Sequence, residues 1–290
     1  MKEHKSYLIL FLPWLAFFTV FTLGMVGYNL FVSFTDWRGI YPSFNFVGLE
    51  NYKNIWSTSG FSESIKNVMI LFFIGLPTTV GISTLLGILL DLLSGWMSSV
   101  LRGISIISMA LGGPIVSLFW TWMFNYRYGG INQVLRDIGL HGLAIDWLGN
   151  SNIVMYGVVL MMIWRFCGFG ALIISAGLNS IPKNQIEAAM IDGAGQRIIY
   201  MKVMLPQIKG QIFTLFLLMS MYLLQSFSYI WPLTGGGPGW ASTLFPELAY
   251  RKMFQDYDFA SGATIANLMF LLVFFIAIPY LYYIREEQNV

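Results

Sequence analysis

The sequence predicts an all-α integral membrane protein with six transmembrane helices. Of its 290 residues, 57% are hydrophobic and only 10% are charged, whereas a soluble domain carries about 25% charged residues. The mean hydropathy is +0.67. Six apolar stretches each supply the roughly 20 helical residues that a bilayer core requires. They form one predicted membrane domain over residues 1–290, with spans at about 7–34, 65–93, 103–124, 152–178, 211–232 and 259–284.

The first apolar stretch is predicted to be a retained span. Lys2 and Lys5 precede it, as in a signal peptide, but the run is much longer than the roughly 7–15 residues of a signal-peptide core. Residues 35–63 then form a polar and aromatic external loop.

Helix-breaking residues interrupt two of the predicted spans. Gly75 and Pro77 lie in the second span, and Gly112-Gly113-Pro114 lies in the third, after a polar link at 94–102. Neighbouring helices or water can satisfy the backbone groups that such residues free. Both stretches are therefore predicted to cross the membrane as single spans.

An even number of spans places both termini on one side. Lysine and arginine divide almost evenly between the two sides, with a slight excess on the side of the termini. This asymmetry is only a weak indication that the termini are cytoplasmic.

The segment 180–210 is the longest interruption of the apolar sequence that still has a helical pattern. Ser180 is predicted to cap its first helix, and Pro182 is tolerated in a first turn. Gly193 is predicted to end that helix in a left-handed cap. A second helical piece follows and Pro206 ends it. The segment is too short to cross a bilayer, so its apolar face is predicted to pack against something, such as a partner protein.

Four strings in this segment carry a family resemblance: Ile181-Pro182, Glu187-Ala188-Ala189, Asp192-Gly193-Ala194 and Leu205-Pro206. Together, between two spans, they resemble the EAA loop of ABC importer permeases. The resemblance implies the type I permease fold, with a cytoplasmic loop that docks into a cleft of a separate ATPase. The residues to which it assigns this coupling are Ile186, Glu187, Ala188, Ala189, Met190, Asp192, Gly193 and Ala194.

Segments outside the loop extend the resemblance over nearly the whole chain. Residues Ser33–Trp37, Phe46–Tyr52, Gly130–Asn132 and Leu233–Pro238 are similar to carbohydrate-type permeases of the maltose-importer class. The resemblance implies import of a sugar or oligosaccharide. It implies a second homologous permease as a heterodimer partner, two ATPase subunits, and an extracellular or periplasmic solute-binding protein. It also implies a bacterial inner or plasma membrane, crossed several times with both termini cytoplasmic.

The chain is not predicted to be an enzyme. A phosphate-binding loop needs Gly-Lys-Ser/Thr, and this string is absent from the sequence. His4, His141 and Cys167 lie far apart and predict no metal site. No cofactor is therefore expected in this chain, and ATP and Mg²⁺ would bind to the partner ATPase.

Two groups of polar residues lie inside predicted spans. Arg165 is in the middle of the fourth span, where a charge costs roughly 2.5–3.5 kcal/mol, so it should face a partner or water. It can either contact the solute or bond to a neighbouring helix. Tyr222, Ser226 and Tyr229 share one predicted helical face, with Gln225 beside them. Interhelical hydrogen bonds are the more common use of such residues.

Maltose-type permeases bind sugar with residues from the spans on either side of the EAA loop, which favours a substrate pathway here. By position, the resemblance assigns Trp164, Gly168, Tyr222, Leu223 and Ser226 to this pathway, and Arg165 and Gln225 complete the predicted set.

Alternative functions stay open at this point. The chain could be a stand-alone secondary carrier or channel, or an ABC permease for a solute other than sugar. The first lacks a carboxylate suited to ion coupling, and an integral-membrane enzyme would lack a catalytic constellation.

Overall fold

A computed structural model describes residues 11–287. Regular structure in this part of the chain is helical throughout, apart from two isolated β-bridges. The predicted all-α class is confirmed. The contacts divide the chain into two compact units: one holds the chain up to Ser62 together with Leu248–Leu272, and the other holds Glu63–Glu247 and the residues from Val273 onward. The single domain over 1–290 stays a prediction.

The first unit joins the first membrane helix to the beginning of the last one. Helix Phe11–Val32 contains the π-turn η1 (Thr19–Leu23) and α2 (Gly24–Val32), and α16 runs over Phe259–Glu287. Asn29 Nδ2 donates to Asn267 Oδ1 (2.8 Å), and Asn267 Nδ2 donates to the Tyr52 hydroxyl (3.2 Å). These amides replace water as partners inside an apolar environment.

Two of the family-like segments meet in this unit. The side-chain amide of Asn51 donates to the carbonyls of Ser33 (2.9 Å) and Thr35 (2.8 Å), so it holds the end of α2 to helix α3 (Glu50–Asn54). In the loop between them, hydrogen bonds from Ser43 and Asn45 to the Asp36 carboxylate lower the pKa of Asp36 below its usual value.

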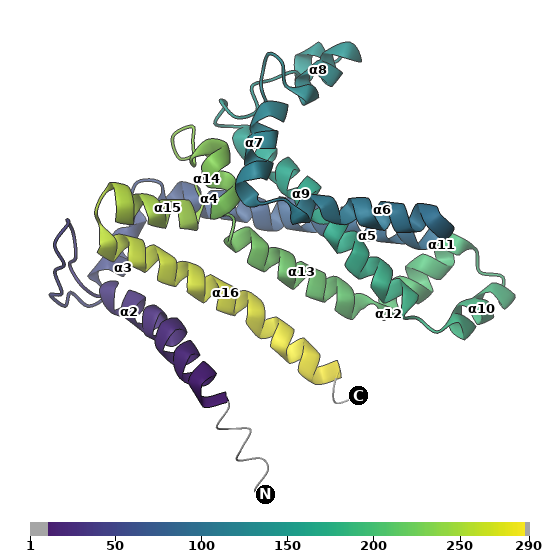
Figure 1. Ribbon diagram of the computed structural model, residues 1–290, viewed down its shortest axis with the longest axis horizontal. Helices are drawn as coiled ribbons and strands as arrows, with labels where there is room; N and C mark the ends of the chain where they lie inside the picture. Colours follow the sequence, from purple (N-terminus) through teal and green to yellow (C-terminus); the bar gives the residue numbers. More distant parts are fainter. Residues whose placement is uncertain (1–10, 288–290) are drawn as a thin grey trace, which may run out of the picture. The chain divides into compact units, whose positions relative to one another are not determined.

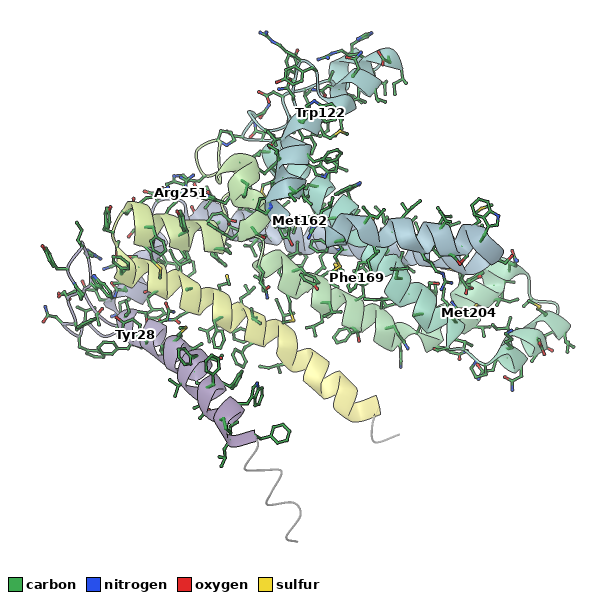
Figure 2. The ribbon with its side chains drawn as sticks, viewed as in Figure 1. Tyr28, Trp122, Met162, Phe169, Met204 and Arg251 are labelled. Atoms are coloured by element: carbon green, nitrogen blue, oxygen red, sulfur yellow. The ribbon has the colours of Figure 1, made fainter. Side chains whose placement is uncertain are left out.

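The second unit is built around α9 (Val154–Asn179), whose most apolar window is 61% buried. It packs against α5 (Leu76–Leu92), which continues α4 (Phe61–Ile70) and the π-turn η3 (Leu71–Gly75) into one long helix (Figure 1). Met162 on α9 is 1% exposed and lies within this packing, whereas Trp122 is 51% exposed and points outward (Figure 2). Helix α9 is therefore the central span of this unit.

The third predicted span is not one helix, contrary to the prediction over 103–124. The structure has α6 (Gly95–Ala110) and α7 (Gly113–Met123), which differ in direction by 98°. Leu111 and Gly112 between them have extended backbones, and Pro114 has no N–H with which to continue the α6 ladder. The predicted polar link over 94–102 is also wrong, because most of it is the first half of α6.

The fifth span, predicted over 211–232, is likewise broken. Helix α13 (Lys209–Leu224) ends where Gln225 leaves helical geometry, and α14 (Phe227–Thr234) begins after Ser226. Tyr222, Ser226 and Tyr229 therefore do not share one continuous helical face as predicted.

Four described helices are long and apolar enough to cross a membrane, and six spans result if each bent pair counts as one. The second pair joins residues Gln196–Gln207 to α13 at a bend of 67°. The remaining helices are short: η2 (Ile55–Ser57), α8 (Gly130–Asp137), η4 (His141–Leu143), α15 (Phe245–Tyr250) and η6 (Arg251–Gln255).

Candidate functional site

The predicted coupling loop contains a short helix, α10 (Lys183–Ile191), that ends in a glycine turn. Gly193 has a φ of +80°, its N–H donates to the Met190 carbonyl (3.0 Å), and the Ala194 N–H donates to the Ala189 carbonyl (3.0 Å). This pair of bonds is a Schellman motif, which satisfies carbonyls that a helix end leaves free. The predicted left-handed cap at Gly193 is confirmed.

The predicted role of Ser180 is wrong. Its hydroxyl donates to the carbonyl of Gly177 (2.7 Å), so it closes the end of α9 and does not cap α10. The N-cap position of α10 is held by Pro182, whose side chain makes no capping hydrogen bond. The two ends are only three residues apart, and sequence pattern alone does not separate them.

Helix α10 has no buried residue, although part of its surface is apolar. Met190 is 55% exposed and Ile191 is 87% exposed, while Ile186 and Ala189 are partly covered. Figure 1 shows α10 at the far end of α9 from α7. An exposed apolar helix face of this kind is the form of surface that inserts into a groove of a partner.

A second helical segment fixes the loop to the membrane helices. It consists of α11 (Gln196–Ile198), the π-turn η5 (Ile199–Met204) and α12 (Leu205–Gln207). Ile199 and Met204 are each 4% exposed and anchor it. Pro206 lies inside α12, and the chain bends at Ile208 two residues later, so the predicted end at Pro206 is displaced.

Sequence reasoning missed the hydrogen bond that joins this segment to α5. The Tyr200 hydroxyl donates to Asp91 Oδ2 (2.7 Å), close to the end of α5 at Leu92. The two residues are 109 positions apart in the sequence. The one available signal was that each is a polar residue near the end of an apolar helical segment.

Arg165 is buried where the third span breaks. Its guanidinium donates to the carbonyls of Ser108 and Met109 (3.3 Å for the latter), near the end of α6. The Ser108 hydroxyl donates back to the Arg165 carbonyl (2.9 Å). The guanidinium carbon also lies 4.7 Å from the ring centre of Tyr229 on α14. Arg165 therefore bonds to neighbouring helices.

The other pathway candidates on α9 differ in their surroundings. Trp164 is half-buried and its ring lies 5.7 Å from the rings of Phe119 and Trp120 on α7. Gly168 lies at the contact with α6, where a Cβ would overlap the carbonyl oxygen of Ser105. A close approach of two backbones explains a glycine there without any ligand.

The candidates from the fifth span surround its break. Tyr222 is half-buried and stacks on Phe166 (5.2 Å between ring centres), and Leu223 is buried. Gln225 is exposed. The Ser226 hydroxyl is fully buried and has no hydrogen-bond partner among the described residues. Phe166 and Tyr229 connect Tyr222 with Arg165, so the structure brings these parts of the predicted set together.

The helices that follow the two breaks pack on each other. The Ser117 hydroxyl on α7 donates to the Tyr229 carbonyl on α14 (2.6 Å), and a Cβ at Gly113 would lie 2.8 Å from the Ser228 carbonyl oxygen. The string Gly112-Gly113-Pro114 is the signal in the sequence for this contact, but the same string is compatible with the single span predicted over 103–124.

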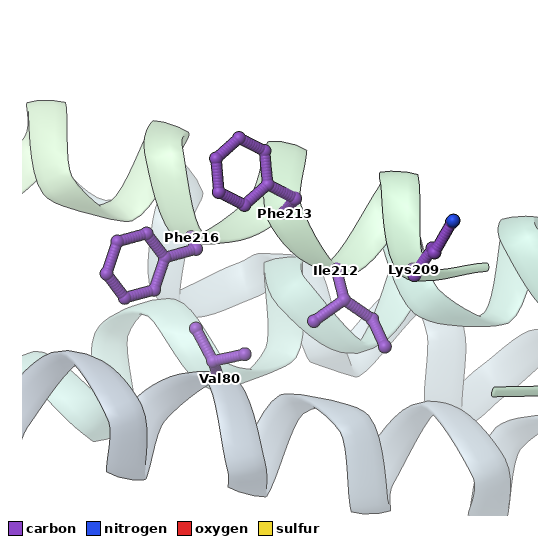
Figure 3. A pocket seen from close by; sticks show the side chains of 5 residues that line it. All are labelled: Val80, Lys209, Ile212, Phe213 and Phe216. Carbon is purple, nitrogen blue, oxygen red and sulfur yellow. The ribbon is translucent and has the colours of Figure 1, made fainter. Parts of the chain in front are cut away.

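Two surface hollows of the second unit differ in chemistry. One, of about 350 Å³, lies between α5 and α13 and is lined by Val80, Ile212, Phe213 and Phe216, with Lys209 at its end (Figure 3). Its apolar wall offers almost nothing to sugar hydroxyls. The other, of about 390 Å³, lies near the beginning of α9. Polar and aromatic side chains line it, among them Asn67, Asn152, Tyr156 and Trp240. Among the described residues, no group of three His, Cys, Asp or Glu side chains could hold a metal ion.

Comparison with known proteins identifies the family. The model of the family described as "Binding-protein-dependent transport system inner membrane component" matches residues 83–287. A probable ABC transporter permease of Pyrococcus horikoshii is 34% identical over 284 residues, which are 98% of this chain and 97% of that protein. A trehalose/maltose transport system permease of Thermococcus litoralis is 33% identical over 282 residues, or 97% and 94% of the two chains.

A solved structure has the same fold. It is a chain of a bacterial alginate ABC transporter in complex with an alginate pentasaccharide-bound periplasmic protein, with a TM-score of 0.83 and 18% identity over 96% of this chain and 93% of that chain. The fold is thus that of a type I ABC importer permease. The chain belongs to the family of binding-protein-dependent transport system inner membrane components, and it is a multi-pass membrane permease of an ABC importer.

Proposed function

We propose that this permease imports a sugar or oligosaccharide that an external solute-binding protein delivers, driven by ATP hydrolysis in separate subunits. The observation that carries the coupling part of the proposal is the exposed apolar helix α10, which ends in the glycine turn. Support for the sugar comes from the carbohydrate-type segments and from a relative named for trehalose and maltose. In this proposal both termini and α10 are cytoplasmic.

The proposed partners complete an importer. A second homologous permease forms a heterodimer with this chain, two ATPase subunits bind ATP and Mg²⁺, and the solute-binding protein docks at the opposite end. The proposed docking residues are the predicted coupling set on α10 and its glycine turn, together with Ile191, which was not in that set. Met190 and Ile191 are the exposed apolar contacts. Small residues such as Ala188 and Ala189 leave room for the partner surface to close over the helix.

The loop is connected so that movement of α10 reaches the spans. The segment 196–207 is attached to α5 by the Tyr200–Asp91 hydrogen bond and runs into α13 through the bend at Ile208. A displacement of α10 by the closing ATPase subunits would thus tilt both spans. Tilting of spans around a fixed site is what alternating access requires.

The proposed solute pathway follows the break of the fifth span. Gln225 and Ser226 offer hydrogen-bonding groups to sugar hydroxyls, and the rings of Trp164 and Tyr222 offer faces to its C–H groups. Leu223 is proposed to form part of the apolar wall. Irregular backbone at membrane depth is tolerated where it lines a cavity, and such breaks are where transporters bind solute.

Purification with the native partners tests the proposal. The chain would be isolated from its own membrane in mild detergent, and the co-purifying subunits would be identified and reconstituted in liposomes. We expect an ATPase and a second permease, and uptake of a labelled sugar only when ATP and the binding protein are present. Uptake of an amino acid or phosphate instead of any sugar would refute the sugar assignment, and solute movement without ATP would refute the coupling.

A further inference from the structure

The end of α6 presents backbone carbonyls that its own helix cannot satisfy. The last four carbonyls of a helix have no intrahelical donor, and α6 stops at Ala110 because the chain turns away by 98°. Water is scarce at this depth, so side chains must supply the donors. Arg165 supplies two of them, to the carbonyls of Ser108 and Met109.

The same guanidinium also contacts the second broken span. Its carbon atom lies 4.7 Å from the ring centre of Tyr229, a distance suited to a cation–π contact. Tyr229 belongs to α14, which begins after the break at Gln225 and Ser226. Arg165 on the unbroken helix α9 therefore touches one helix that ends at the first break and one that begins after the second.

The surrounding packing leaves Arg165 little freedom. The Ser108 hydroxyl returns a hydrogen bond to the Arg165 carbonyl, and Gly168 brings α9 against α6 one turn away. The residue is 5% exposed, and its two terminal nitrogens are occupied by α6. Nε has no hydrogen-bond partner among the described residues, but it is buried with the rest of the side chain, so a solute would have to displace the surrounding helices to contact it.

We infer that Arg165 is a positioning residue that fixes both helix breaks and does not itself contact the solute. Its guanidinium donates hydrogen bonds to the free carbonyls at the end of α6, where the third span turns. It also contacts the ring of Tyr229 on α14, and α14 in turn packs on α7. The inference rests on the proposed function for its transport readout only. The geometry of the breaks can be measured whatever solute is carried.

Two substitutions separate charge from geometry. Arg165→Gln removes the charge, and Arg165→Lys keeps the charge but replaces a planar fork by a single ammonium group that cannot span two carbonyls in the same way. Loss of one charge-assisted hydrogen bond corresponds to about a ten- to hundredfold shift between the held and released arrangements. We expect the maximal uptake rate to fall in the order wild type, Lys, Gln, with an unchanged half-saturating solute concentration.

The angle between α6 and α7 provides a direct readout. Spin labels would be attached to cysteines at Val100 and Leu118, which are 46% and 73% exposed, in a Cys167→Ala background of the complete transporter. The distance distribution between them should be narrow with Arg165 and broad or shifted in Arg165→Gln, with Arg165→Lys between the two. An unchanged distribution together with a raised half-saturating concentration would overturn the inference and make Arg165 a solute contact.

A second pair of variants keeps the test valid if Arg165→Gln does not fold. Tyr229→Phe retains the ring beneath the guanidinium, and Tyr229→Leu removes it. We expect the Val100–Leu118 distribution to stay narrow in the first and to broaden in the second. Equal distributions in both would show that the ring does not hold the break, and the connection between the two breaks would be refuted.

Discussion

Gly193 and Gly195 are exposed glycines of the same turn, yet the backbone demands glycine at only one of them. Gly193 has a φ of +80°, whereas Gly195 has a φ of −71° that any residue can adopt. No heavy atom of the described chain would lie within 4 Å of a Cβ at either position. Space is therefore equal at both sites, and only the conformation differs.

This difference predicts that Gly193→Leu uncouples the transporter and Gly195→Leu does not. A side chain in the left-handed region costs roughly 1–2 kcal/mol, so the turn after α10 would rearrange. We expect uptake per ATP hydrolysed to fall about tenfold, the factor that roughly 1.4 kcal/mol produces. Proteoliposome assays of uptake and hydrolysis measure this ratio. Equal ratios in the two variants would mean that the turn has no part in coupling.

The proposed pathway makes a prediction at the Tyr222 hydroxyl. Tyr222→Phe keeps the ring that stacks on Phe166 and removes a group that can bond to sugar. A lost hydrogen bond of about 0.5–1.5 kcal/mol should raise the half-saturating sugar concentration several-fold. Tyr28→Phe is the control, because Tyr28 is 53% exposed on the first membrane helix. If both variants kept the wild-type concentration dependence, Tyr222 would not contact the solute through its hydroxyl.

Single residues differ in how well the sequence predicts their roles. The cap at Gly193 was predictable, because a left-handed helix end depends on adjacent residues. The contact of Gly168 with Ser105 was not, because it depends on how closely two distant helices approach. The alternatives for Arg165 stayed open for the same reason, since its partners are 56 and 57 positions away.

Helices α5 and α9 pack closely at a glycine of α5. A Cβ at Gly87 would lie 2.7 Å from Cβ of Ile174, whereas Gly81 on the same helix has no described heavy atom within 4 Å of such a position. Gly87→Val should therefore lower the stability of the purified transporter by about 1–3 kcal/mol through overpacking. Gly81→Val should leave it nearly unchanged. Thermal unfolding in detergent compares the two, and similar midpoints would contradict the close packing.

A hydrogen bond from Tyr200 to Asp91 connects the loop with α5. A bond to a charged acceptor contributes about 1.5–3 kcal/mol, and less where water competes. Tyr200→Phe and Asp91→Asn should each reduce uptake per ATP, and the double variant should be no worse than either single one. Additive losses in this double-mutant cycle would show that the two residues act independently.

The sequence predicts the helices whose existence follows from the length of an apolar stretch. It does not predict where packing against other helices breaks them. Four of the predicted apolar stretches overlap described helices that are long and apolar enough to cross a membrane, the third overlaps the bent pair α6 and α7, and the fifth overlaps α13 and α14. The first break was missed because membrane helices tolerate Gly and Pro, so Gly112-Gly113-Pro114 did not distinguish a continuous span from a turn of 98°. The second break, at Gln225 and Ser226, contains no helix-breaking residue that could have indicated it. The contacts of α7 with α14 and of Arg165 with α6 accompany that turn, and both are long-range.

For the whole molecule, the central claim is that a separate ATPase binds α10 and that its closure on ATP moves α10 and the spans connected to it. The family membership makes the chain an importer permease, and the exposed face of α10 is the surface on which coupling is proposed to act. Within the second unit, this helix lies beyond the end of α9 that Ser180 closes, while the apolar lengths of α9 and of the long helix Phe61–Leu92 suit a bilayer.

Site-directed cross-linking of Ile191→Cys in native membranes tests this claim most directly. Ile191 is 87% exposed on α10, and Trp96→Cys is the matched control, 76% exposed on α6 just after the end of α5. Both would be made in a Cys167→Ala background and treated with a short bifunctional reagent. The account predicts an adduct of Ile191→Cys with an ATPase subunit and none for Trp96→Cys. Failure of Ile191→Cys to cross-link in an intact, ATP-hydrolysing complex would contradict it.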